Sequence, residues 1–413
     1  MLIHGNHEEE EIVKGLCEKL PRITFIHKKT VDYRGYTFVG HGGGGFAERD
    51  ESFEKWALDL VALATVADMM PLTGENRVLV KWGLVVLNKT KRLGLQTLIE
   101  AALIKRKITA TEIGFAIAPR INAAGRLDHA NVAYDLLRQD TKAAARADAE
   151  KLNKTNEARQ RLTERVCTEA KKQASIQFKK GDRVLVVHNL KKHAWPTGVV
   201  GLVAGRLVRQ YTRPAFVIGY ADHGVAGSAR TVGEFNITHA LKSAEKFLDK
   251  YGGHPQAAGF TLKVGTTPLQ KIKKLKAALE TYATEHLSDA DLIPQSEVSA
   301  ELELKEITWK LVHELERLVP YGKENPEPEF VSRGVVVASV RTMGKNNSHC
   351  KFVLTQNHAS ATAVLFRASA EAQKVKQGDS VTIVYTIEIN EWNGKKSIQL
   401  MIRHIELVSD QID

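Results

Sequence analysis

The amino-acid sequence predicts an α/β protein of several domains, with a mostly helical segment, one long helix, an α/β domain and a small β-barrel in that order. Three observations support this prediction. A chain of 413 residues is too long for a single hydrophobic core. Strand-like and helix-like segments alternate over about 180–285. Five strand-like segments then follow one another between residues 334 and 407.

The first part of the chain mixes short strands with helices. Residues 1–56 are expected to form strands and one helix, and they end in a flexible loop in which His41 precedes four glycines. The expected strands are 2–3, 23–27 and 36–39, and the expected helix is 8–20. The apolar segments of residues 57–137 are typical of helices.

A long helix is predicted from Thr141 to about Lys180. This segment is rich in Ala, Lys, Glu, Arg and Gln and contains neither Pro nor Gly, so we expect a solvent-exposed connector between domains. The next segments predict a buried strand at 183–188, a helix with small residues on one face at 199–210, and a strand at 215–218.

The last part of the chain is expected to be a β-barrel. After a polar link at 288–299, strands are predicted at 334–340, 351–355, 361–366, 380–389 and 397–407. Five strands in this order suggest an OB-fold. Asn393-Gly394, between the last two strands, is a strong signal for a hairpin.

Composition points to a polyanionic partner and a reducing compartment. The chain has 59 Lys and Arg against 48 Asp and Glu, a formal charge of +11. A basic excess suggests a polyanion, although it can also serve solubility alone. Three widely spaced cysteines match no metal-binding pattern and fit a cytoplasmic protein. No apolar stretch is long enough to span a bilayer, so we expect no membrane association.

Asp68 ends one of the most apolar segments of the chain, residues 58–72. A carboxylate buried in such surroundings is costly unless something pairs with it. A metal ion is one partner that would do so. The alternative is that Asp68 simply caps the turn before Pro71. The residues themselves leave both interpretations open.

Residues 119–126 combine arginines with small side chains. Arg120, Asn122 and Arg126 flank an Ala-Ala-Gly sequence, which lets the backbone approach a ligand closely. Arginine binds phosphate through two parallel hydrogen bonds, so a nucleic-acid backbone is the expected ligand. The alternative is a helix start with solvated charges.

Two further segments are rich in small residues and are predicted to be loops. Residues 227–231 contain Ser228, Arg230 and Thr231, and residues 251–260 contain Gly253 and His254. Together they could cradle a phosphate with backbone N–H groups and the two basic side chains. Each segment taken alone could equally be an ordinary turn.

Weaker signals lie at the two ends of the chain. Asn6 and His7 follow a strand-like segment and have metal-ligand chemistry. In the predicted barrel, aromatic side chains could stack on bases while basic ones follow the phosphates, or the aromatics could belong to the barrel core. These residues are Tyr321, Phe330 and Trp392 with Lys323, Arg333, Arg341, Lys345, Lys351, Lys395 and Lys396.

Several of these segments together resemble a known family. From about residue 57 onward the chain resembles RecJ, a family of single-stranded-DNA-specific 5′-to-3′ exonucleases in the DHH phosphoesterase superfamily. The resemblance is carried by residues 58–72, 119–126, 195–207, 227–231, 252–259, 318–330 and 390–400. It implies part of a DHH-type α/β catalytic domain, a connecting helix, a DHH-associated α/β domain and an OB-fold.

The resemblance also implies roles for individual residues. Asp68 looks like the last metal-ligand Asp of the family, which holds Mn²⁺ or Mg²⁺. Residues 120, 122 and 126 look like the segment near the DNA path. Arg230, Thr231 and the segment 252–259 look like the pocket for the terminal phosphate and the adjacent nucleotide.

The sequence departs from the family pattern in its first part. The Asp-x-Asp and Asp-His-His motifs of the family, which supply most metal ligands, are absent. Residues 1–56 instead resemble a fragment of a calcineurin-like metallophosphoesterase, in which Asn6 and His7 would bind metal. Domains are therefore expected at 1–56, 57–140, 141–180 (the connecting helix), 181–287 and 295–410.

Three hypotheses follow. The first is a RecJ-like exonuclease that hydrolyses single-stranded DNA with Mn²⁺ or Mg²⁺ in DNA repair or recombination. The second is a non-catalytic single-strand-binding protein, because Asp68 with His7 and His41 gives too few ligands for two metal ions. The third is a metallophosphoesterase. Single-stranded DNA is the expected partner of the first two.

Overall fold

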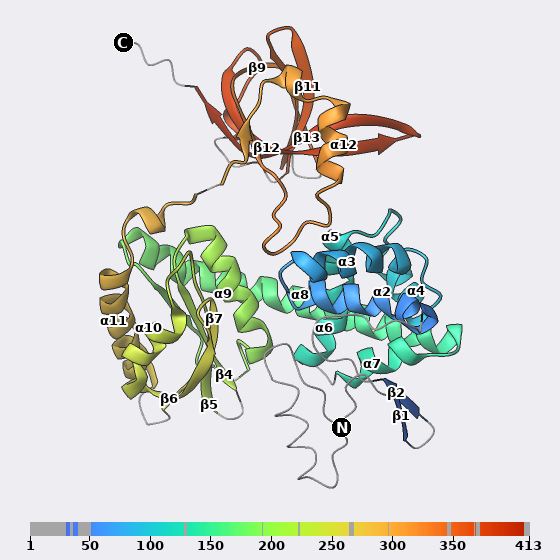
Figure 1. Cartoon of the computed structure of the whole chain (residues 1–413). Helices are drawn as coiled ribbons and strands as arrows, with labels where there is room; N and C mark the ends of the chain where they lie inside the picture. The colour runs from blue at the N-terminus through green and yellow to red at the C-terminus, as the bar shows by residue number, and fades with distance from the viewer. Residues whose placement is uncertain are drawn as a thin grey trace, which may run out of the picture.

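The computed structural model describes residues 30–33, 36–39, 51–127, 130–191, 193–221, 224–263, 268–295, 297–344, 348–366, 368 and 372–408. Three bodies are visible: a helical part, an α/β part and a β-barrel (Figure 1). Residues 30–39 contribute a two-stranded hairpin, β1 (Thr30–Tyr33) and β2 (Tyr36–Val39), which confirms a strand at 36–39. The expected strands at 2–3 and 23–27 and the helix at 8–20 lie outside the described residues, as do Asn6, His7 and His41.

The helical part packs short helices around one core. Its elements are α2 (Glu51–Ala67), α3 (Gly74–Leu87), α4 (Leu93–Ala101), α5 (Ala110–Glu112), the π-helical turn η1 (Ile113–Ile117), α6 (Ala118–Leu127) and α7 (Asn131–Arg138). Leu87, Leu95, Leu98 and Ile117 are buried at its centre. The prediction of a mostly helical segment at 57–137 is therefore confirmed. The described residues of this segment contain no strand, so they show only helices of the expected DHH-type α/β domain.

Helix α8 (Lys142–Lys179) connects the helical part to the α/β part, as the sequence predicts. It is less exposed than expected, because small residues at helical spacing bury one face. Ala145, Ala149 and Leu152 join the helical core, whereas Val166, Ala170 and Ala174 pack under the neighbouring sheet. One helix therefore belongs to two cores.

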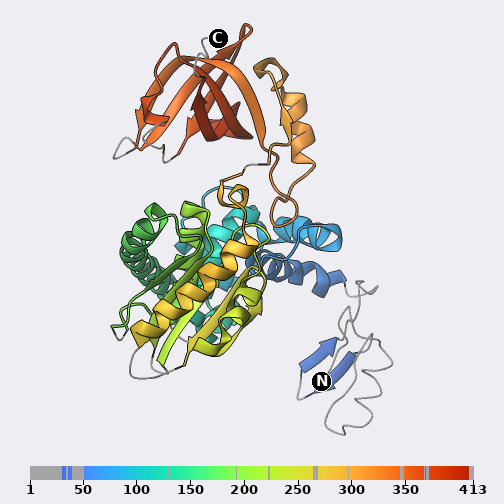
Figure 2. The same cartoon turned by 90° about the vertical axis from the view of Figure 1, so that its left-hand side faces the viewer.

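The α/β part contains a five-stranded sheet in the order β3-β4-β5-β7-β6, in which only β3 and β4 are parallel. Helices α8 and α9 cover one face, and α10 and α11 cover the other (Figure 2). The elements are β3 (Leu185–His188), α9 (Thr197–Tyr211), β4 (Ala215–Ala221), β5 (Gly224–Arg230), α10 (Ile237–Ser243), η2 (Glu245–Phe247), β6 (Leu248–His254), β7 (Ala257–Leu262) and α11 (Pro268–His286).

The prediction of loops at 227–231 and 251–260 was wrong. Residues up to 230 belong to β5, and 251–260 form most of the hairpin β6–β7. Their backbone N–H groups are largely used by the sheet ladder, and Ser228 and Gly259 are direct partners. Glycine in a strand marks a close approach to another group rather than a loop.

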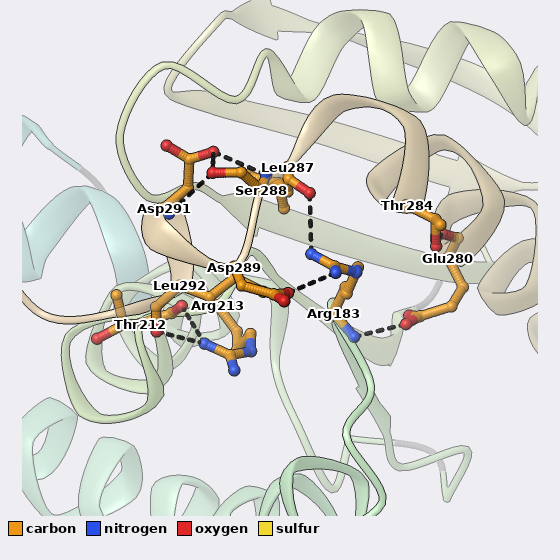
Figure 3. Close-up of polar contacts among 10 residues, drawn as sticks. All are labelled: Arg183, Thr212, Arg213, Glu280, Thr284, Leu287, Ser288, Asp289, Asp291 and Leu292. Atoms are coloured by element: carbon orange, nitrogen blue, oxygen red, sulfur yellow. Dashed lines mark hydrogen bonds and ion pairs between the residues drawn. The ribbon is translucent and has the colours of Figure 1, made fainter.

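The link to the barrel is bound to the α/β part at its start (Figure 3). Arg183 donates from Nη1 to the carbonyl oxygen of Leu287 at 2.8 Å and from Nη2 to a carboxylate oxygen of Asp289 at 2.6 Å. Arg213 donates to the carbonyl oxygen of Leu292 at 2.7 Å. Two arginines of the α/β part therefore fix the direction in which the chain leaves it.

The C-terminal part is a five-stranded barrel, which confirms the predicted OB-fold topology. Strand β9 pairs with both β10 and β12, and this closes the barrel. Asn393 and Gly394 both have positive φ, as the predicted hairpin turn requires. The elements are η3 (Ala290–Leu292), β8 (Ala300–Glu301), η4 (Leu304–Glu306), α12 (Trp309–Glu316), β9 (Phe330–Met343), β10 (His349–Gln356), β11 (Ala359–Leu365), η5 (Ala372–Lys374), β12 (Ser380–Trp392) and β13 (Lys395–Leu407).

Candidate nucleic-acid interface

An open groove of about 480 Å³ lies on the sheet face beside α9. Side chains alternate across a sheet, so Ala226 and Ser228 of β5 face this groove while Ala229 faces the opposite core. Gly259 of β7 and Gly252 of β6 continue the same surface in register. This row of the floor therefore carries only small side chains, which lets a ligand backbone approach the sheet, while Lys250 and Tyr251 of β6 also line the groove.

The start of α9 forms the wall of the groove. Thr197 and Val200 line it, and α9 begins directly after Pro196. Gly201 keeps this wall close to the floor, because a Cβ there would lie 3.1 Å from both Ser228 Oγ and Arg230 Nη2, and those two side chains would have to shift. The first turn of a helix presents N–H groups and a partial positive charge, which favour an anion.

Arg230 is the half-buried basic side chain next to this floor. Its Nη1 donates to Ser228 Oγ at 2.9 Å and to the carbonyl oxygen of Ala229 at 2.7 Å. Burial lowers the pKa of Arg230, and the charge of Arg126 lowers it further. Both causes disfavour the unpaired cation, so an anion placed here would relieve them.

Arg126 brings positive charge to the groove from the helical part. Its Nη1 donates to the carbonyl oxygen of Gly198 at 3.2 Å, across the boundary between the two parts. A side chain at position 198 would collide with Arg126, because its Cβ would lie only 2.4 Å from the Arg126 carbonyl oxygen. Glycine at this position therefore lets α6 and α9 meet.

Two more arginines extend the positive region, and the residue patterns did not identify them. Burial lowers the pKa of Arg159 on α8, and Arg126 and Arg206 lower it further. Within the described structure, Arg159 Nε is buried without a hydrogen-bond partner. Arg206 on α9 is bound to Glu164 at 2.6 Å. Its signal was visible in the sequence, because Arg206 is the one charged residue in the apolar segment 197–208.

The other predicted phosphate contacts are more scattered. Arg120 lies within the packing of α6 on α8, where it donates to Asn153 Oδ1 at 2.9 Å and to the carbonyl oxygen of Ala116 at 2.8 Å. Burial lowers the pKa of Arg120, and the charge of Glu157 opposes this shift. Asn122 is exposed on α6.

Thr231, Gly253 and His254 lie at the strand ends of the α/β sheet. The Thr231 hydroxyl donates to the carbonyl oxygen of Val232 at 3.2 Å. Gly253 has φ of +146°, and a Cβ there would lie 2.4 Å from the Ala257 carbonyl oxygen. His254 is exposed at the end of the β6–β7 hairpin.

Asp68 is exposed rather than buried, directly after the end of α2. The apolar segment therefore does not enclose the carboxylate as expected. No group of three or more His, Cys, Asp or Glu side chains that could hold a metal ion occurs in the part of the chain that the structure describes. Asp68 alone would supply only part of the octahedral oxygen shell that Mg²⁺ takes.

The barrel residues fall into different environments. Phe330 is buried in the barrel core, and Tyr321 donates its hydroxyl hydrogen to the carbonyl oxygen of Leu315 at 2.8 Å. Lys323 is exposed, and only the backbone of Trp392 is described. The residue patterns did not identify the aromatic pair of His349 and Phe366. The two ring centroids lie 5.1 Å apart in an edge-to-face arrangement, and Phe366 is 56% exposed.

Among the helices within the described ranges, none combines the length and the apolar character needed to cross a bilayer.

Comparison with known proteins agrees with this architecture. Family models of the DHHA1 domain and of the RecJ OB domain match residues 181–285 and 298–404. The single-stranded-DNA-specific exonuclease RecJ of Bacillus subtilis is 34% identical over 349 residues, 84% of this chain and 43% of that protein. RecJ of Thermus thermophilus is 33% identical over 347 residues, 81% of this chain and 46% of the relative.

Solved structures give the same result. The crystal structure of RecJ from Thermus thermophilus in complex with Mg²⁺ has a TM-score of 0.72 and 30% identity, over 85% of this chain and 52% of that chain. The corresponding Mn²⁺ complex also has a TM-score of 0.72 and 30% identity, over 85% of this chain and 50% of that one. The chain thus spans about half the length of these relatives.

The likeness of residues 1–56 to a calcineurin-like metallophosphoesterase is not supported. Both matching family models lie beyond residue 180, and the relatives above are RecJ proteins. The motif around Asn6 and His7 is too short to outweigh them, because four residues match by chance often.

Proposed function

Because this chain is a homologue of the RecJ exonucleases and carries a DHHA1 domain and a RecJ OB domain, we propose that it binds single-stranded DNA in the groove beside α9. The observation that carries the proposal is a floor of small residues with basic side chains around it: Lys250 lines the groove, Arg230 is hydrogen-bonded to Ser228, and Arg126 is hydrogen-bonded to Gly198 at the start of α9. Arg159 and Arg206 extend the positive charge beyond Arg126, and Glu164 neutralises only part of it.

A phosphate of the strand fits the chemistry of this groove. Arg230 offers charge-assisted hydrogen bonds, Ser228 adds a hydroxyl, and the first turn of α9 adds backbone N–H groups. Gly252 and Gly259 leave space for the sugar-phosphate chain to lie against the sheet. These groups bind and orient a strand, but they supply no nucleophile.

The reaction that we propose is RecJ-type 5′-to-3′ hydrolysis of the phosphodiester bond, in DNA repair or recombination. Divalent metal ions such as Mn²⁺ or Mg²⁺ would supply an activated water in such a reaction. Asp68 is the ligand proposed from this chain. Among the described residues, Asp68 is not part of a group of three or more His, Cys, Asp or Glu side chains that could hold such an ion.

The second candidate is a single-strand-binding protein without catalysis. The same finding favours it, because an isolated exposed carboxylate cannot organise metal ions while the basic groove remains complete. In both cases the strand occupies the same groove.

One experiment separates the two candidates. The chain is incubated with Mn²⁺ and a 5′-labelled single strand, and product release is followed in parallel with binding. Release of mononucleotides that disappears in Asp68→Ala supports the exonuclease. Salt-sensitive binding without cleavage supports the binding protein, and the absence of both rejects the two candidates together.

A further inference from the structure

The turn that carries Asp68 has an unfavourable local conformation. The N–H of Met70 donates to the carbonyl oxygen of Thr65 at 3.0 Å, and the N–H of Met69 donates to that of Val66 at 3.2 Å. This is a Schellman ending of α2, in which the residue after the helix is left-handed and is usually glycine. Here it is Met69, with φ of +54°.

Charge and exposure add to this cost. Asp68 places a carboxylate at the helix C-terminus, where the partial charge of the helix is already negative. Met69 and Met70 are 67% and 47% exposed, so their own burial contributes little to hold the turn. Such a conformation persists only where surrounding structure fixes it.

The surrounding structure comes from the foot of the barrel. We define the foot loop as residues 317–325, which descend from α12 toward the helical part (Figure 1). Its Lys323 carbonyl oxygen accepts a hydrogen bond from the N–H of Leu72 at 2.7 Å. Leu72 is 2% exposed, and a Cβ on Gly322 would lie 2.6 Å from Leu72 Cδ1. The loop therefore touches the chain four residues after Asp68.

A second contact lies beside the first. Arg77 at the start of α3 donates from Nη2 to the carbonyl oxygen of Arg317 at 2.8 Å, and Asn76 donates to the carbonyl oxygen of Pro71 at 3.1 Å. The segment from Pro71 to Arg77 is thus held by one hydrogen bond within the segment and by hydrogen bonds to the foot loop.

The foot loop is also braced internally. The amide of Asn325 donates to the carbonyl oxygens of Leu318 at 3.0 Å and Pro320 at 2.8 Å, and Asn325 pairs with Gly322 through backbone hydrogen bonds. Tyr321 is bound to the last turn of α12 through its hydroxyl. A braced loop can impose its own geometry on the turn that it touches.

We infer that the foot loop is a positioning element, which holds the turn containing Asp68 through the Lys323 carbonyl group and the close contact of Gly322 with Leu72. The position of Asp68 is then set by the barrel, although Asp68 belongs to the helical part. This inference goes beyond the proposed function and depends on it only for the catalytic importance of Asp68.

Hydrogen exchange of the full chain, without DNA or metal, tests the inference. In Gly322→Val the new side chain must displace Leu72, so the Leu72 amide should exchange at least tenfold faster, with the change confined to residues 69–77. Lys323→Ala is the matched control, because the contact uses the backbone carbonyl group and not the side chain. Equal exchange in the wild type and Gly322→Val would overturn the inference, as would equal acceleration in both variants.

A double variant distinguishes this specific contact from general loss of stability. Gly322→Ala introduces the clash with Leu72, whereas Leu72→Ala removes the atoms that it meets. In the double variant, the amide of residue 72 should exchange within about threefold of its rate in Leu72→Ala alone. If the accelerations of the two single variants add up in the double variant, the inference is contradicted. Binding of single-stranded DNA should be unchanged in Gly322→Val, so a failure of the proposed groove is recognised separately.

Discussion

Arg230→Met tests the groove most directly, because it removes the positive charge of the guanidinium group and retains a long, unbranched apolar side chain. Two of the hydrogen bonds of Arg230 go to Ser228 and Ala229, which leaves Nη2 beside Gly201 to meet a phosphate. A hydrogen bond to a charged group contributes about 1.5–3 kcal/mol. At about 1.4 kcal/mol per factor of ten, affinity for a single strand should fall roughly 10- to 150-fold.

The salt dependence supplies a second, independent magnitude. Each phosphate contact with a single strand contributes about 0.7 to the slope of log affinity against log salt concentration. Arg230→Met should therefore reduce the slope by about 0.7, which corresponds to one contact. Fluorescence anisotropy of a labelled oligodeoxythymidylate, titrated at several salt concentrations, measures both quantities.

Arg209→Met is the matched control for this prediction. Arg209 is exposed in the last turn of α9, at the end of this helix away from the groove. It should leave affinity within about twofold and the slope unchanged. If Arg230→Met binds like Arg209→Met at every salt concentration, the assignment of the groove as the DNA site is wrong.

Three further outcomes are expected. Gly201→Ala should favour helix formation by up to about 1 kcal/mol yet weaken DNA binding by crowding Arg230, which urea unfolding and anisotropy measure separately. Asp59→Ala removes a buried carboxylate that accepts hydrogen bonds from Thr90 Oγ1 and Arg92 Nε, so it should lower the free energy of unfolding by about 1–3 kcal/mol in urea titrations. A change below about 0.5 kcal/mol would contradict this. Burial raises the pKa of the Tyr385 hydroxyl to about 12 from 10, so the stability that comes from keeping this hydroxyl neutral is complete below pH 10 and is lost as the pH rises toward 12. Between pH 10 and 12 the free energy of unfolding of the wild type should fall by roughly 2 kcal/mol more than that of Tyr385→Phe. Parallel plots of unfolding free energy against pH for the two proteins would refute the raised pKa.

Much of the architecture could be predicted because it depends on local patterns. The long helix from Thr141 lacks Pro and Gly, and its observed bounds, Lys142–Lys179, follow the pattern closely. Alternation and turn residues located the strands of the barrel, and Asn393-Gly394 adopts the backbone conformation that its hairpin requires. In these segments each residue responds mainly to its neighbours in sequence.

The segments rich in glycine were misread for a physical reason. The small residues of 227–231 and 251–260 resemble a loop when only backbone freedom is considered. In the structure Gly227 is a strand residue, and a Cβ there would lie 2.4 Å from the ring of Phe260 on the neighbouring strand β7. That contact joins residues far apart in the chain, so no local pattern reveals it.

The sequence by itself determined the order of the domains, the basic character of the chain and the small-residue segments that mark the groove. The tertiary structure alone decided which charges meet. Arg126, Arg159, Arg206 and Arg230 come from α6, α8, α9 and β5, and they converge only because α8 enters both cores. It also decided that Asp68 lies exposed on a turn held by the barrel. Electrostatic and packing energies depend on distance in space, and folding sets that distance independently of separation along the chain.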